Sequence, residues 1–231
     1  MERSRPARRP NMKMAESAKN IKLNRLKPGV LDQAVAVFLE AFKKEAFTKT
    51  LLDLNNQKHY NLYFKAVKYK VSLYLETGQL VFSVQDNDKE GRLAGLFILR
   101  SPQIKAPTGL SIRRIIPVLP SFAMLLPNYL RAAQLGQAAK PPEDLPAGHY
   151  ALEGLAVAPE YQGQGLARMM LEKADQVATR DESSPGIYLY TGDEKNRAIY
   201  ERFAYKVLKT VPTRSFTAYH MFKWTKQFSG S

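Results

Sequence analysis

Cysteine is absent from the sequence of 231 residues. Disulfide bonds and thiolate metal ligands are therefore excluded, as is a cysteine nucleophile that would form a covalent intermediate. We predict no metal site. Long apolar runs are absent too, because the longest candidate, residues 115–126, is interrupted by Pro117 and Pro120. A helix that spans a bilayer needs about 20 consecutive apolar residues, so we expect no membrane partner.

Acidic side chains are scarce relative to basic ones. There are 21 aspartates and glutamates against 35 lysines and arginines, which gives a net charge of +14, and most of the surplus lies before residue 150. Nucleic-acid binding is one interpretation of this surplus. Binding of an anionic small ligand, together with a solvated basic surface, is the other. The arginine and aromatic pattern of a known RNA- or DNA-binding module is missing, so the second interpretation is favoured and nucleic acid is not an expected partner.

The beginning of the chain differs in composition from the rest. Residues 1–19 are rich in basic side chains and show no periodic apolar face, which predicts a disordered basic tail. Organelle-targeting segments are also rich in arginine, but they are amphipathic, whereas this stretch contains Pro6 and Pro10. We therefore expect a cytoplasmic protein, with organelle targeting by the tail as the alternative. Residues 20–231 are long enough to bury one core, and we predict a single domain.

The first part of this domain shows alternating helix and strand patterns. Residues 21–26 alternate between apolar and polar side chains, which predicts a strand. Apolar spacing predicts one helix over residues 31–42 and a second, with an aromatic stripe, over residues 60–74. Two further strands are predicted at residues 80–85 and 93–100, joined by a turn-rich hairpin loop.

The most informative stretch is HYALEGLAVAPEYQGQGLA, residues 149–167. An apolar run ending at Val157 predicts a strand, and a turn then leads to Gly163 and Gly165, where a helix is predicted to begin. The first N–H groups of a helix have no partner within the helix and lie at its positive end. A glycine lets a phosphate approach these amides closely. The stretch therefore predicts an anion site.

Two motifs in order resemble one known family. Residues 162–167 fit the pattern Gln/Arg-x-x-Gly-x-Gly/Ala, and about thirty residues later a strand leads to Asn196, Tyr200 and the pair Ala204-Tyr205. In these motifs the sequence resembles the GNAT superfamily of acyl-CoA-dependent N-acetyltransferases. It is neither a P-loop nor a dinucleotide fingerprint, because the required lysine and third glycine are missing.

The resemblance implies an α+β fold, with a mixed, mostly antiparallel sheet flanked by helices. The remaining elements fit this GNAT acyl-CoA N-acyltransferase fold. After the motif strand, the sequence predicts helix 166–180, strand 187–191, helix 195–202, strand 205–211 and a last strand at 216–224.

Residues 101–148 interrupt the pattern before the motif strand. This stretch is rich in proline and ends in a helix-like segment at 129–137. It resembles the insertion of the puromycin N-acetyltransferase-like small-molecule branch, where it helps to shape the acceptor pocket. The alternative is that it only covers the sheet. Tyr190 stands where enzymes of that branch often have a glutamate, and this departure weakens any transfer of their acceptor residues.

The resemblance implies an enzyme that moves an acetyl group from acetyl-CoA to a primary amine of a small molecule by direct transfer. The alternative is a non-catalytic acyl-CoA-binding or nucleic-acid-associated module on the same scaffold. A monomer and a homodimer are both compatible with the sequence. Arg168 and Arg202 are candidates for neutralising the phosphates of the cosubstrate, and the alternative is that both are solvated surface residues. The residues implied in binding acetyl-CoA are Leu155, Ala156, Val157, Gln162, Gly163, Gln164, Gly165, Leu166, Ala167, Asn196 and Tyr200.

Two residues are candidates for catalysis. Glu153 lies in an apolar strand, where a carboxylate must be paired, protonated or placed in a cleft. A regular pleat would point it to the same face as Leu155 and Val157. We predict it as the general base, and a salt bridge across the sheet is the alternative. The resemblance places Tyr200 near the sulfur of CoA as the proton donor, and a core tyrosine is the alternative.

Asn196 has two possible roles, and Ala204 departs from the family pattern. The resemblance implies that Asn196 bonds the pantetheine arm, and its position also suits a helix cap. Ala204 replaces the glycine that the family usually carries, so the backbone there is strained if the position needs a positive φ.

Overall fold

The computed structural model describes residues 21–89, 91–104 and 129–225. The predicted basic tail, residues 1–19, lies outside the described residues. The same is true of residues 105–128, which form the middle of the predicted insertion.

The described residues form one seven-stranded sheet in the order β1-β2-β3-β4-β5-β7-β6. All neighbouring strands are antiparallel except β4 and β5, which are parallel. The predicted α+β fold with a mixed, mostly antiparallel sheet is therefore confirmed. The strands are β1 (Ile21–Arg25), β2 (Leu80–Asp86), β3 (Arg92–Arg100), β4 (Tyr150–Val157), β5 (Gly186–Thr191), β6 (Lys206–Pro212) and β7 (Thr217–Trp224).

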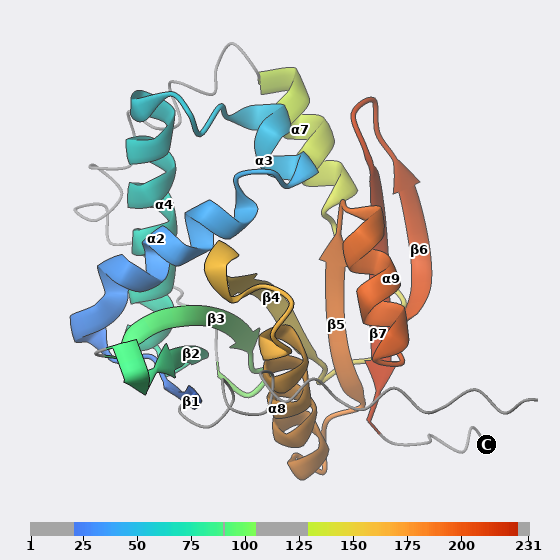
Figure 1. The fold of residues 1–231 in the computed structure, drawn as a ribbon. Helices are drawn as coiled ribbons and strands as arrows, with labels where there is room; N and C mark the ends of the chain where they lie inside the picture. The colour runs from blue at the N-terminus through green and yellow to red at the C-terminus, as the bar shows by residue number, and fades with distance from the viewer. Residues whose placement is uncertain (1–20, 90, 105–128, 226–231) are drawn as a thin grey trace, which may run out of the picture.

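Helices cover both faces of this sheet (Figure 1). α2 and α4 pack on one face and α8 on the other, while α9 lies against β5 and α3 lies beside α7. Every helix predicted from the sequence is present within the described residues, and α3 is an addition of six residues, too short to show an apolar period. The helices are α2 (Leu31–Phe42), α3 (Ala46–Leu51), α4 (Gln57–Glu76), α7 (Tyr129–Ala138), α8 (Leu166–Arg180) and α9 (Glu194–Arg202).

Strand β3 contributes side chains to two separate cores. Phe97 and Leu99 pack in the cluster that contains Met170 of α8, whereas Leu96 and Ile98 pack with α2 and α4. Successive side chains of a strand point to opposite faces of the sheet. Because helices cover both faces here, the sequence of β3 is almost continuously apolar.

Strands β4 and β5 separate soon after they begin. They pair at Tyr150 with Ile187 and at Ala151 with Tyr188, and Figure 1 shows the two strands diverging beyond this point. The crossover between them is α8, as expected for a parallel pair. The later part of β4 therefore presents an edge that β5 does not cover.

A bulge in β4 changes the direction of Glu153. Ile98 of β3 is opposite Gly154 and Leu99 is opposite Leu152, so that Glu153 is an extra residue in the ladder. The regular pleat assumed in the sequence analysis does not hold at this point. The Glu153 side chain instead contacts α4 and lies on the face opposite to Leu155, which packs toward the α8 cluster.

Candidate active site

The separation of β4 and β5 opens onto a groove of about 680 Å³. It runs from the uncovered edge of β4 over the beginning of α8 to one side of α9. Most of the residues predicted to bind acetyl-CoA line it together. These are Leu155, Val157, Gln162, Gly163, Gly165, Leu166, Ala167 and Asn196.

The two glycines of the loop have backbone conformations that other residues rarely adopt. Gly163 has φ +77° and Gly165, the N-cap of α8, has φ +83°. A β-carbon added at either position would meet no atom within 4 Å, so the space beside them is open toward the groove. The amides of the first turn of α8 have no carbonyl partner within the helix, and this loop exposes them to an anion in the groove.

Three residues predicted to bind the cosubstrate do not line the groove, namely Ala156, Gln164 and Tyr200. The methyl group of Ala156 is buried in the core formed with α2 and α4. Gln164 uses its side-chain N–H group to donate a hydrogen bond of 2.9 Å to the carbonyl oxygen of Glu160. Ala156 therefore packs in the core, whereas Gln164 bonds the backbone of the loop.

Basic side chains border the groove on two sides. Lys44, which follows α2, and Arg202, at the end of α9, both line it. Arg168 does not line it and pairs with Glu172 on the exposed side of α8, over 2.9 Å. Of the two arginines singled out in the sequence, the structure brings Arg202 to the groove.

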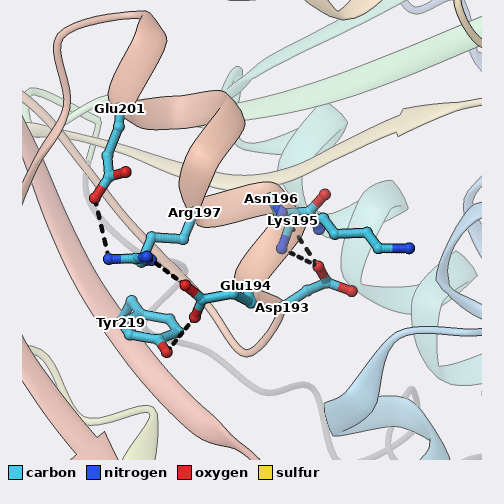
Figure 2. A network of polar contacts seen from close by, with 7 residues as sticks. All are labelled: Asp193, Glu194, Lys195, Asn196, Arg197, Glu201 and Tyr219. Carbon is cyan, nitrogen blue, oxygen red and sulfur yellow. Dashed lines mark hydrogen bonds and ion pairs between the residues drawn. The ribbon is translucent and has the colours of Figure 1, made fainter.

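A network of polar contacts fixes the beginning of α9 (Figure 2). Asp193 caps the helix, because its Oδ1 accepts hydrogen bonds from the backbone N–H groups of Lys195, over 2.7 Å, and Asn196, over 3.1 Å. The capping role considered for Asn196 therefore belongs to Asp193. Glu194 pairs with Arg197 and accepts a hydrogen bond from the hydroxyl group of Tyr219, which joins α9 to β7.

A second cavity of about 340 Å³ adjoins the groove. Four residues line both spaces, namely Phe42, Glu45, Leu155 and Asn196, and we call this set the junction. The second cavity lies between α2, α4, the bulge of β4 and the end of β5. Aromatic side chains form much of its wall: Phe38, Phe42, Tyr63, Tyr190 and Tyr200.

Three donors hold the carboxylate of Glu153 in this second cavity. Its Oε2 accepts a hydrogen bond of 2.6 Å from the hydroxyl group of Tyr74 and lies 2.7 Å from Lys70 Nζ, while Oε1 lies 2.8 Å from Arg100 Nε. Burial raises the pKa of Glu153, but Lys70, Tyr74 and Arg100 together outweigh it, so the pKa lies below its usual value. The carboxylate is ionised and ion-paired across the sheet, which makes it a weak proton acceptor.

Tyr200 lines the second cavity but not the groove. Its ring packs edge-on against that of Tyr205, with centroids 5.7 Å apart, and against the core on the α8 face. Burial raises the pKa of Tyr200 to about 12. Its hydroxyl group therefore stays protonated at neutral pH and is a hydrogen-bond donor beside the junction.

Glu45 is a site residue that the sequence analysis missed. It is the N-cap of α3, and its Oε2 accepts a hydrogen bond of 3.0 Å from the backbone N–H group of Thr48. Its Oε1 approaches the turn after β5, where a β-carbon added to Gly192 would lie 3.4 Å away. The short α3 gave no periodic signal, and glutamate is not among the preferred N-cap residues, so nothing in the local sequence marked this position.

Within the described ranges, no group of three or more His, Cys, Asp or Glu side chains is arranged to hold a metal ion. Over the same part of the chain, no helix is long and apolar enough to cross a membrane.

Comparison with known proteins identifies part of the chain and its fold. Residues 125–205 match the model of the acetyltransferase (GNAT) family. No curated protein sequence matches the chain. A structure described as histone acetyltransferase HPA2 and related acetyltransferase, from Corynebacterium glutamicum, is 14% identical and has a TM-score of 0.65, covering 91% of this chain and 99% of that chain.

Two further solved structures share the fold. Arylalkylamine N-acetyltransferase 2 from Aedes aegypti is 15% identical with a TM-score of 0.57, covering 90% of this chain and 100% of that one. PaiA N-acetyltransferase from Thermoplasma acidophilum, solved in complex with coenzyme A, is 13% identical with a TM-score of 0.53, covering 88% of this chain and 98% of that one.

The matched segment contains the glycine loop, α8 and most of the second motif, up to Tyr205. The similarity to the puromycin-type branch stays a prediction. Residues 125–205 are therefore similar to the acetyltransferase (GNAT) family, and the described chain shares the fold of the solved N-acetyltransferases.

Proposed function

We propose that the protein transfers an acetyl group from acetyl-CoA directly to a primary amine of a small molecule. The observation that carries this proposal is the junction, where the groove and the aromatic cavity meet. A thioester that enters along the groove and an amine that enters the cavity would meet there. Direct transfer between two bound substrates needs such a meeting point, because it gains its rate from proximity and orientation.

The groove fits the parts of acetyl-CoA in order. The amides at the beginning of α8 would bind the pyrophosphate, with Lys44 and Arg202 supplying positive charge on either side. The uncovered edge of β4 at Leu155 and Val157 would bond the pantetheine arm, with Asn196 opposite. The CoA complex of the PaiA enzyme, which shares this fold, supports the assignment.

The amine must lose a proton before it can attack, since an alkyl ammonium has a pKa of about 10.4. We assign this proton transfer to Glu45, because Glu45 is the carboxylate at the junction. Glu153, predicted as the base from the sequence, is the alternative and would act through water. Its ion pairs with Lys70 and Arg100 and its lowered pKa make it a weak base.

We assign to Tyr200 the role of stabilising the sulfur of CoA as it departs. In the reaction the amine nitrogen forms a bond to the carbonyl carbon, the carbon–sulfur bond breaks, and the amine proton finally reaches the thiolate. A phenol of pKa about 12 does not readily give its proton to a thiolate whose conjugate thiol has a pKa of about 8.5. We therefore infer that Tyr200 stabilises the thiolate by a hydrogen bond and that the proton comes from the amine through Glu45.

A calorimetric titration with acetyl-CoA tests the cosubstrate site. We expect the wild-type protein to bind acetyl-CoA and the Gly165→Trp variant to lose binding, because the indole would fill the loop. The matched control is Gly78→Trp, since Gly78 also has a positive φ, +80°, and open space around it but lies at the end of α4. Binding to wild-type protein should be followed by an assay of thiol release with a panel of amines.

The main rival is a non-catalytic acyl-CoA-binding module. Tight binding of acetyl-CoA without thiol release for any amine would favour that module. A nucleic-acid-associated role would instead require an affinity for nucleic acid that falls steeply with salt. Absence of binding at low salt would exclude that role.

A further inference from the structure

The acceptor cavity carries charges of opposite sign at its two ends. Three residues of β4 mark the path from the groove into the cavity: Val157 lines the groove, Leu155 lies at the junction, and Glu153 lines the cavity. Glu153 lines the cavity but not the groove, so the Glu153 end lies beyond the junction, away from the groove. Glu45 stands at the near end of this path.

Positive charge is in excess at the far end. Glu153 is the shared partner of Lys70, over 2.7 Å, and Arg100, over 2.8 Å, so one carboxylate faces two cations. Tyr74, which completes this cluster, has its pKa raised by burial and by the hydrogen bond to Glu153, and it is neutral. Of the two cations, Lys70 lines the cavity.

Lys70 is able to bind a second anion. Its side chain is half exposed, and an ammonium group has three N–H donors, of which the ion pair with Glu153 needs one. Arg100 and Tyr74 would continue to hold Glu153 if Lys70 turned partly toward a ligand. Lys70 is therefore held by Glu153 and still has N–H groups that can donate to a ligand.

The space between the two ends is apolar. Its walls come from four elements. The lining side chains are Phe38 of α2, Val67 and Val71 of α4, Ile98 of β3 and Tyr190 of β5. The ring of Phe38 lies directly over Gly154, whose added β-carbon would come within 2.6 Å of it. A flat apolar group fits such a passage better than a charged chain.

We propose that the acceptor is an amphoteric amine: a primary amine that binds at Glu45, an aromatic spacer between the cavity walls, and a carboxylate at the distal end that binds Lys70. This inference rests on the proposed N-acetyltransferase function. It makes Lys70 a specificity-determining residue, because it distinguishes an amine with a distal anion from one without it.

Two amines with the same ring and the same aminoethyl arm test this assignment. 4-(2-Aminoethyl)benzoate carries the distal carboxylate, and 2-phenylethylamine lacks it. For the wild-type protein we expect kcat/KM to be about fivefold higher for the benzoate, as one partly exposed ion pair predicts. The Lys70→Gln variant should lose this preference. The control is Lys68→Gln on the same helix, since Lys68 pairs with Asp32 over 2.6 Å and does not line the cavity, and it should keep the preference.

The outcomes separate this inference from the proposed function. Equal or lower kcat/KM for the benzoate in the wild-type protein would overturn the inference, as would a preference that survives in Lys70→Gln. If neither amine releases thiol, the enzyme assignment is in question, and the inference is judged by calorimetry of both amines with the CoA-bound protein. Tighter binding of the benzoate that is lost in Lys70→Gln would support it, and no binding of the benzoate would overturn it.

Discussion

The hydroxyl group of Tyr74 donates a hydrogen bond of 2.6 Å to Oε2 of Glu153. The bond joins α4 to the bulge of β4, at the point where Lys70 and Arg100 also hold the carboxylate. Hydrogen bonds to a charged group contribute about 1.5–3 kcal/mol each to stability. The bulge and the helix that covers it are therefore held as one unit beside the acceptor cavity.

We expect Tyr74→Phe to lower the free energy of unfolding by about 1.5 kcal/mol at neutral pH. The pKa of Glu153 is lowered in the folded protein, so its stabilising effect is present above the unfolded pKa of about 4.3 and is lost as the pH falls through the folded pKa. The variant would raise this folded pKa toward the usual value. The difference between variant and wild type should therefore shrink as the pH falls below about 4, measured by urea denaturation.

Tyr69→Phe is the matched control for this experiment. Tyr69 lies on the same helix, and its buried hydroxyl group has no hydrogen-bond partner among the described residues. Removing an unsatisfied hydroxyl group is neutral or stabilising. A loss of stability in Tyr69→Phe as large as that in Tyr74→Phe would contradict the role given to the bond with Glu153.

Glu45→Gln should lower kcat/KM for the amine by about 10² or more. The glutamine oxygen can still accept the hydrogen bond from the Thr48 backbone, so α3 should keep its cap. The dissociation constant for acetyl-CoA should change little, because the proposed phosphate contacts come from the glycine loop and the basic side chains. Steady-state kinetics and calorimetry on the same preparations measure both effects.

Glu153→Gln decides between the two candidate bases. If Glu45 takes the proton, Glu153→Gln should reduce kcat/KM less than Glu45→Gln does, and mainly through KM, because Lys70 would lose its partner. A larger loss of kcat in Glu153→Gln than in Glu45→Gln would instead make Glu153 the base.

Tyr200→Phe should lower kcat about tenfold, with little change in the affinity for acetyl-CoA, because one hydrogen bond to the departing sulfur is lost. The pKa of Tyr200 is about 12, so ionisation of this residue should not limit the wild-type rate at any pH up to about 10. The pH–rate profile checks this statement. An alkaline limb below that pH that disappears in Tyr200→Phe would contradict it.

Much of the fold follows from local patterns in the sequence. The long helices α4 and α8 have apolar residues at helical spacing, and the strands β3 and β4 are largely apolar runs. The glycine loop marks the beginning of α8. The short α3 has no period of its own and is held by its packing against α7 (Figure 1). Its presence could not be read from its sequence.

The candidate site was predicted where one segment forms it and missed where distant segments meet. Gly163, Gly165 and their neighbours lie in one loop, and the groove contains them as expected. Glu45 and Lys70 come to the site only because α2 and α4 pack over β4. The direction of Glu153 depends on a bulge, and one inserted residue turns a side chain to the other face of a sheet.

The backbone of Ala204 is strained, as predicted for a residue with a β-carbon at a position that needs a positive φ. It has φ +65°, and it ends α9 in a Schellman motif: its N–H group bonds the carbonyl oxygen of Glu201 over 3.0 Å, and that of Tyr205 bonds Tyr200 over 3.2 Å. A left-handed conformation costs a residue with a β-carbon about 1–2 kcal/mol, which a glycine at this position would avoid.

We therefore expect Ala204→Gly to raise the free energy of unfolding by about 0.5–1 kcal/mol, because relief of the strain exceeds the added entropy of glycine in the unfolded chain. Ala198→Gly is the control, since Ala198 lies inside α9 and glycine in a helix interior costs about 1 kcal/mol. The two substitutions make the same chemical change, so thermal unfolding should shift in opposite directions. A loss of stability in Ala204→Gly would mean that the left-handed backbone at this position is not what limits the stability of α9.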